Sequence, residues 1–96
     1  MAKNVSFKCT CPQSVGRVRV FQNAGDNNPL EVLLFLQSGT RTARLDPGAY
    51  LAIIDALGAP NTAFAIELSG GGEMKALGVT LPFDGRLSRN RKVVVA

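Results

Sequence analysis

This chain of 96 residues contains no histidine and only two cysteines. Histidine is the commonest general base near neutral pH, so its absence excludes catalysis by serine–histidine or cysteine–histidine pairs. A structural zinc site is fully ligated by cysteine, histidine or carboxylate side chains, and a lone pair of cysteines cannot complete it. We therefore predict a protein that is not an enzyme, holds no metal or cofactor and has no small-molecule substrate.

The two cysteines, Cys9 and Cys11, are separated by one residue at the end of a predicted strand. Both side chains would point to the same face of that strand. A disulfide closing so short a loop would be strained. We therefore interpret both residues as small apolar side chains of the core.

The seven carboxylates are the remaining candidates for acid–base chemistry. Most lie in predicted turns or on outward positions of predicted strands, whereas Asp55 is flanked by apolar residues on both sides. A carboxylate in such a place is more often a strand-end or capping group than a catalytic one. An enzyme that uses carboxylates alone therefore ranks below the non-enzymatic hypotheses.

Long hydrophobic runs are also missing, since none approaches the roughly 20 residues of a membrane span. The N-terminal segment MAKNVSFKC has neither an apolar h-region nor a small-residue cleavage site. We expect cytoplasmic synthesis without a signal peptide and no membrane contact. Hydrophobic residues at 46% and charged residues at 19% are typical of a globular chain. The length predicts a single β domain over residues 1–96.

Apolar and polar residues alternate with a period of two along residues 5–11, 17–20 and 64–68, which indicates strands with one buried face. Residues 30–36 form a short apolar run between turn signals, typical of a buried strand that ends in a hairpin. Residues 41–45 would return from that hairpin.

Glycine-rich and Asp-Gly segments supply further turns. The sequence Ser69-Gly70-Gly71-Gly72 lacks the lysine and hydroxyl residue of a phosphate loop and is interpreted as a hairpin tip. In total we expect about seven or eight short antiparallel strands. The predicted fold class is all-β, a small β-sandwich or a partly open barrel.

Residues 46–57 leave an alternative open. Asp46, Pro47 and Gly58 could cap a helix over this segment, which would make the fold α+β. As a strand, the segment would instead follow an Asp-Pro-Gly turn. Between Ala49 and Leu57 only Asp55 is charged, so a helix would have no polar face, and the strand is favoured.

Positive charge is in excess, with a formal net charge of +4. It concentrates in a predicted basic loop or arm at about residues 83–92, followed by a short terminal strand at 92–96. The candidate partner-binding residues are Phe83, Arg86, Arg89, Arg91, Lys92, Val93, Val94 and Val95. We expect Phe7, Phe35 and Phe64 to lie in the core, which leaves Phe21 and Phe83 as the aromatic residues that could stack on nucleic acid.

These features support two functional hypotheses. The first is a non-enzymatic structural or assembly protein that packs as repeated copies in a larger particle. A phage or virus-like virion component, such as a capsid, decoration or tail protein, is the concrete expectation. The alternative is a small binding module that recognises an acidic partner, either nucleic acid or protein, through the C-terminal arginine cluster.

Overall fold

The computed structural model describes residues 1–96 and contains nine β-strands and no helix. The strands are β1 (Lys3–Thr10), β2 (Ser14–Phe21), β3 (Glu31–Phe35), β4 (Gly39–Leu45), β5 (Gly48–Gly58), β6 (Ala63–Gly70), β7 (Glu73–Met74), β8 (Leu77–Thr80) and β9 (Arg86–Val95). With no helix present, the structure has no segment that could cross a membrane as a helix.

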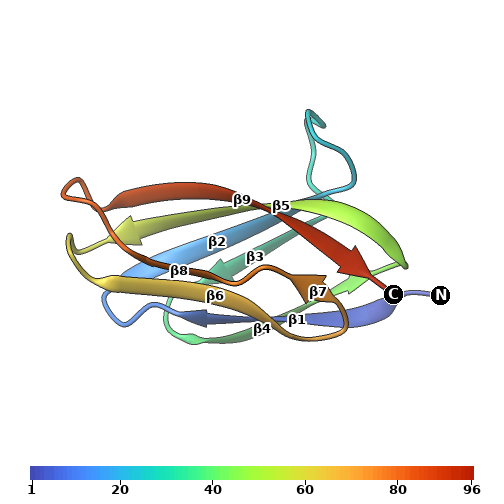
Figure 1. The fold of residues 1–96 in the computed structure, drawn as a ribbon, viewed down its shortest axis with the longest axis horizontal. Helices are drawn as coiled ribbons and strands as arrows, with labels where there is room; N and C mark the ends of the chain where they lie inside the picture. Colours follow the sequence, from blue (N-terminus) through green and yellow to red (C-terminus); the bar gives the residue numbers. More distant parts are fainter.

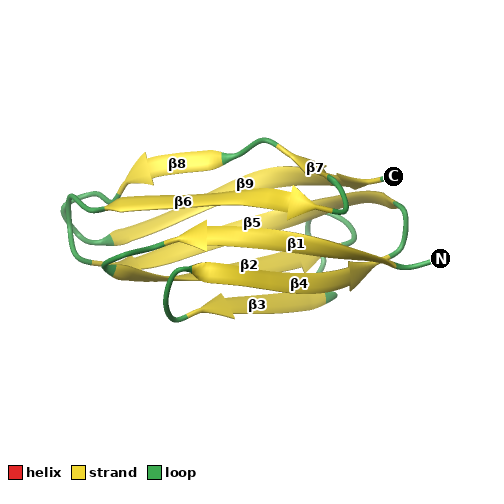
Figure 2. Cartoon of the chain, turned by 90° about the horizontal axis from the view of Figure 1, so that it is seen from below, coloured by secondary structure: helices red, strands yellow, loops and turns green.

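Two antiparallel sheets pack against each other as a β-sandwich. Sheet A has four strands in the order β4-β1-β6-β8, and sheet B has five in the order β3-β2-β5-β9-β7. Figure 1 shows the sandwich from its edge, with sheet B as the upper layer, and Figure 2 looks onto sheet A. The predicted all-β sandwich is confirmed, and the sheets do not close into a barrel.

The core lies between the two sheets and consists of 19 buried hydrophobic residues. Alternate residues of each strand point inward, as the period-two pattern predicts. Phe7, Phe35 and Phe64 are its largest members, and each is at most 2% exposed. No polar or charged residue is buried, so the core is held by apolar packing alone.

The ambiguous segment at residues 46–57 is a turn followed by a strand, and the helix alternative is wrong. β5 lies in the middle of sheet B between β2 and β9, which pair with almost its whole length. Its inward residues Ala52, Ile54 and Ala56 are buried. The hydroxyl of Tyr50 donates a hydrogen bond of 2.6 Å to the carbonyl of Asp46 and so ties the strand to its turn, as in the tyrosine corner of other sandwiches.

The hairpin expected between residues 30–36 and 41–45 is not formed. β3 pairs with β2 in sheet B, whereas β4 pairs with β1 in sheet A, so the connection crosses from one sheet to the other. Cys11 donates its backbone N–H to the hydroxyl of Ser38 in this crossing, at 2.8 Å. β3 is therefore one of the two edge strands of sheet B, and its only neighbour in the sheet is β2.

The basic arm expected at residues 83–92 is also not formed. A turn at residues 82–85, with Gly85 at a φ of 71°, leads directly into β9, which is ten residues long. The terminal valines continue this strand, and Val93 and Val95 are buried at 0% and 2% exposure. Backbone pairing with β5 holds this segment in a strand. The polar residues of the segment indicated a loop because they carry no information about that distant pairing.

Candidate protein interface

The outer face of sheet B carries the side chains that alternate with the core positions of its strands. Antiparallel register arranges these side chains in rows across the sheet. The rows are Leu34–Arg17–Asp55–Ser88, Val32–Arg19–Ile53–Asn90, Phe21–Leu51–Lys92 and Val15–Leu57–Arg86. Apolar residues dominate at the β3 side of the face, and polar residues dominate at the β9 side.

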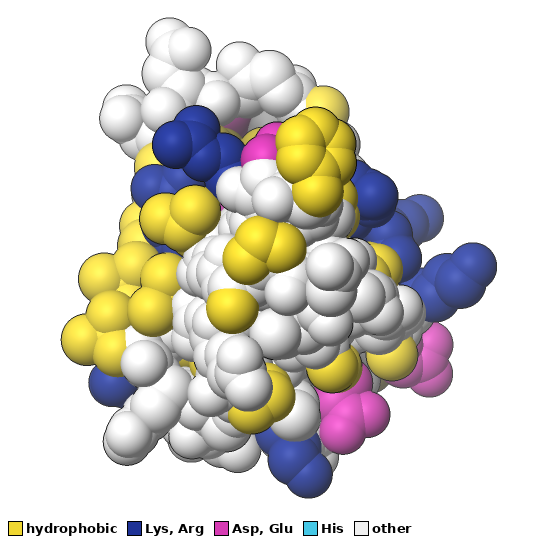
Figure 3. All heavy atoms as spheres, turned by 90° about the vertical axis from the view of Figure 1, so that its left-hand side faces the viewer, with side chains coloured by type: hydrophobic (Ala, Val, Ile, Leu, Met, Phe, Trp, Pro, Cys, Tyr) yellow, Lys and Arg dark blue, Asp and Glu magenta, His cyan; other side chains and the backbone are white.

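Exposed apolar side chains follow β3 and its two ends. Val32 and Leu34 are 48% and 52% exposed, and the flanking Leu30 and Leu36 are 51% and 76% exposed. We call these four residues the apolar stripe. In Figure 3, which looks at one end of the sandwich, hydrophobic side chains gather along the left side of the molecule.

The apolar surface continues from the stripe towards the middle of the sheet. Val15 and Leu57 are exposed beside Leu34 and Leu36, and together they line a shallow depression that reaches Arg17 and Asp55. Monomeric soluble proteins seldom expose contiguous apolar patches without a binding role. This surface is therefore the strongest candidate for an interface.

The outer face of sheet A is polar instead. Its cross-strand partners include Asn4 with Arg44, Ser6 with Thr42, and Lys8 with both Thr40 and Glu67. The hydroxyls of Ser6 and Thr42 lie 3.2 Å apart and form a hydrogen bond. This face follows the usual rule that the solvent side of an antiparallel sheet is polar.

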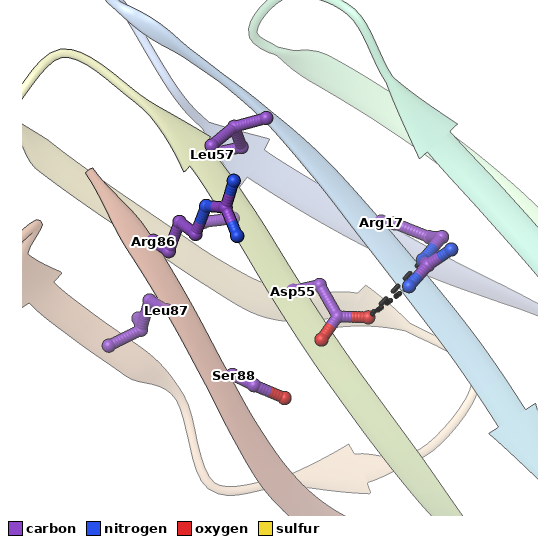
Figure 4. Close-up of a pocket in the computed structure, with 7 residues that line it drawn as sticks. Arg17, Asp55, Leu57, Arg86, Leu87 and Ser88 are labelled. Atoms are coloured by element: carbon purple, nitrogen blue, oxygen red, sulfur yellow. Dashed lines mark hydrogen bonds and ion pairs between the residues drawn. The ribbon is translucent and has the colours of Figure 1, made fainter. Parts of the chain in front are cut away.

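An ion cluster lies at the centre of the outer face of sheet B. One carboxylate oxygen of Asp55 accepts hydrogen bonds from Arg17 at 2.9 Å and from Arg19 at 3.1 Å. Figure 4 shows Arg17 reaching from β2 to Asp55, with Ser88 and Arg86 on β9 beyond it. The guanidinium of Arg19 also lies over the ring of Phe21, 5.8 Å from its centre.

Burial is the largest single influence on the pKa of Asp55 and would raise it, but four smaller influences in the opposite direction together outweigh burial. Hydrogen bonds from Ser88 and Arg17 and the charges of Arg19 and Arg17 stabilise the carboxylate. The pKa of Asp55 is therefore held below its ordinary value of 3.8. A carboxyl group whose pKa lies below its ordinary value is poorly matched to general acid or base chemistry at neutral pH.

The predicted basic cluster is divided between two sides of the molecule. Arg86 and Lys92 are paired with Leu57 and Leu51, so they lie on the outer face of sheet B. Arg89 and Arg91 are paired with Ile54 and Ala52 and lie on the opposite side of β9. Nε of Arg91 donates to the carbonyl of Lys75 at 3.2 Å.

The aromatic candidates are also separated. Phe21 is 6% exposed and largely unavailable for stacking, whereas Phe83 is 87% exposed in the turn before β9. Among the terminal valines, only Val94 is exposed. The predicted contact residues therefore do not form one surface.

Both cysteines are buried and not disulfide-bonded, which agrees with their interpretation as core residues. Burial raises the pKa of the Cys9 thiol to about 12, and the neighbouring Cys11 thiol adds to the effect. Because the thiolate is the reactive form, Cys9 is inert at neutral pH.

The apolar stripe was missed by the sequence reasoning, which assigned the run at residues 30–36 to a buried strand. The signal in the sequence was that the residues pointing to either face of this strand are mostly apolar, as they would be in a strand covered on both faces. In the structure only one set is covered, because no third layer packs on sheet B.

Comparisons of the chain with protein-family models, with curated proteins and with solved structures found no match. The functional argument therefore depends on the surfaces described above.

Proposed function

We propose that the protein is a non-enzymatic assembly component that associates with further copies of itself through the side of sheet B that carries the apolar stripe. The observation that supports this is the difference between the two outer faces. Sheet A presents Ser6, Thr42 and similar polar residues to solvent, whereas sheet B presents the apolar stripe. Contact between two copies would bury the exposed part of each leucine in the stripe, and the hydrophobic effect would favour that burial. The kind of particle, a phage or virus-like virion in our hypothesis, stays a prediction.

The test is the mass of the protein in solution as its concentration rises, measured by light scattering. The parent chain should exceed its monomer mass of 10.2 kDa. The double variant Leu34→Ser with Leu57→Ser should remain a monomer, since it removes two exposed apolar side chains from this face. Its unfolding free energy should stay within about 1 kcal/mol of the parent, because both sites are exposed.

A double variant on the other face is the control. Ser6→Ala with Thr42→Ala changes the outer face of sheet A and should leave the mass distribution unchanged. A parent chain that stays monomeric at every concentration would contradict the proposal, as would equal effects of the two double variants.

A second candidate function follows from the charges on the same face. Its strand positions carry the cations Arg17, Arg19, Arg86 and Lys92 against two carboxylates, those of Asp55 and Glu73. Positive charge beside an apolar surface suits an acidic segment of a partner protein. Poly-L-glutamate is a suitable probe, and its binding should weaken strongly as sodium chloride is raised. Binding that is independent of salt would exclude this function.

A further inference from the structure

β3 differs from the other three edge strands of the sandwich. Edge strands are usually protected against pairing with other chains by charges, proline or short length. β4 carries Arg41 and Arg44, β8 has four residues and β7 has two. β3 has five residues, and Glu31 at its start is its only charged residue.

The single charge on β3 is engaged within its own chain. Oε1 of Glu31 accepts a hydrogen bond of 3.4 Å from the backbone N–H of Arg44. β3 pairs only with β2, so alternate backbone N–H and C=O groups on its other side face no strand. These groups and the apolar stripe lie along the same edge.

We propose that two copies of the protein pair through β3, antiparallel, about a two-fold axis at Leu33. This inference rests on the proposed function and specifies how the copies associate. Val32 would lie opposite Leu34 of the second copy, and Glu31 would lie opposite Phe35 of the second copy. The two copies of sheet B would then form one continuous sheet, with backbone hydrogen bonds across the junction.

The sequence around Leu33 is self-complementary under this symmetry. In a two-fold interface, each contact occurs twice with the copies exchanged. Val32 and Leu34 of one copy meet Leu34 and Val32 of the other, and at the two ends Leu30 approaches Leu36. The exposed apolar stripes of both copies therefore become neighbours, and cross-strand apolar pairs of this kind stabilise sheets.

Charge favours pairing at the edge over stacking of the two outer faces. The strand positions of the face carry four cations and two carboxylates, Asp55 and Glu73, so stacking would oppose two surfaces of the same net sign. Edge pairing places β3 of both copies between the β2 strands that carry Arg17 and Arg19. The β2 strands of the two copies are then three strand spacings apart, roughly 14 Å. This distance exceeds the Debye length of about 8 Å at physiological ionic strength, so repulsion between their arginines is screened.

The first experiment compares two lysine substitutions at similarly exposed sites. Val32 and Leu57 are 48% and 53% exposed on the same face, but only Val32 lies on the edge strand. In sedimentation velocity, Val32→Lys should raise the dimer dissociation constant at least about tenfold, because an edge lysine opposes strand pairing. Leu57→Lys should change it less than about threefold. Circular dichroism verifies that both variants remain folded.

The second experiment tests the register by cross-linking. A tagged Val32→Cys chain is mixed with an untagged Leu34→Cys chain and mildly oxidised. Because opposite residues bring their Cβ atoms within about 5 Å, the mixed disulfide dimer should form faster than either homodimer. The native Cys9 and Cys11 are buried and should not compete.

The outcomes separate this inference from the proposed function. Loss of association in Leu57→Lys but not in Val32→Lys would overturn edge pairing and leave the outer face as the interface. Faster formation of the Val32→Cys homodimer would also overturn the proposed register, since that result indicates either parallel pairing or an antiparallel pair centred on Val32. A parent chain that never associates would overturn both.

Discussion

The outer faces of sheets A and B have the same strand architecture but opposite surface chemistry. In sheet A, the strands turn large apolar residues inward, and the outward positions carry mainly polar residues and alanine, as in the Ser6–Thr42 pair. In sheet B, the alternation persists in β2 but fails in β3, where Val32 and Leu34 are apolar and exposed. This difference between the two faces is the basis of the proposed interface.

The edge strands β4 of sheet A and β3 of sheet B also differ in polarity. β4, at one edge of sheet A, has outward polar residues and two arginines, and β3 beside it has neither. An apolar face and an unprotected edge therefore coincide in one strand. Their coincidence is more informative than either feature alone, because strand pairing uses backbone groups and side chains together.

The largest expected effect comes from the core that both faces share. Phe64 lies on the inner side of sheet A and is 1% exposed. Phe64→Ala should lower the unfolding free energy by roughly 3 to 5 kcal/mol, because it removes a large buried ring and leaves a cavity. Urea denaturation measures this loss. A variant as stable as the parent would contradict the packing between the sheets.

The ion cluster of sheet B should have a measurable but smaller effect. Asp55→Asn should cost about 1 kcal/mol at neutral pH, since Arg17 and Arg19 lose their shared carboxylate. Glu67→Gln on the outer face of sheet A is the matched control. Glu67 is paired in register with Lys8 but forms no ion pair, so its change should be within about 0.5 kcal/mol.

The cost of Asp55→Asn should also depend on pH. The pKa of Asp55 is lower in the folded chain than its ordinary value of 3.8, so its stabilising effect is present above that value. It should decline as the pH falls below about 4 and vanish below the folded pKa. Denaturation of parent and variant across this range measures the difference, and a difference that persists in acid would argue against the ion cluster.

Transferring apolar residues to sheet A tests whether an apolar face is sufficient for association. Ser6→Val with Thr42→Val removes one exposed hydrogen bond and should change the unfolding free energy by only about 0.5 kcal/mol. We expect the mass distribution to remain that of the parent, because Arg41 and Arg44 still protect the β4 edge. Additional association through sheet A would show that edge protection is unimportant.

The smallest effects on stability are expected for the arginine cluster. Arg86→Ala with Lys92→Ala acts on the outer face of sheet B, and Arg89→Ala with Arg91→Ala acts on the other side of β9. Each pair should change stability by about 0.5 kcal/mol or less. If an acidic partner binds the outer face, the first pair should weaken poly-L-glutamate binding more than the second. An equal loss of poly-L-glutamate binding in both double variants would indicate that the acidic partner binds another surface.

Much of the fold could be predicted from local sequence. Alternation identified β1, β2 and β6, and the Asp-Pro-Gly turn placed the start of β5. The core positions of Phe7 and Phe64 followed from the same alternation, and that of Phe35 followed from the apolar run at residues 30–36. These features depend on residues close together in the chain, and side chains of successive strand residues always point to opposite faces.

The errors concern pairing between distant segments. Residues 30–36 and 41–45 have the strand character that was expected, but they belong to different sheets. Residues 86–92 are polar enough to be a loop, yet β5 and the core contacts of Leu87 hold them in a strand. A short local pattern cannot show which distant strand will satisfy its backbone hydrogen bonds.

The sequence by itself favoured an all-β fold and determined which side chains share a face in its alternating segments, because successive residues of a strand point to opposite faces. Only the tertiary structure decided which faces are covered and which strands lie at the edges. The run at residues 30–36 is equally suited to a covered central strand, and its exposure results from the absence of a neighbour beyond β3. The apolar stripe, and with it the proposed interface, is therefore a property of strand order.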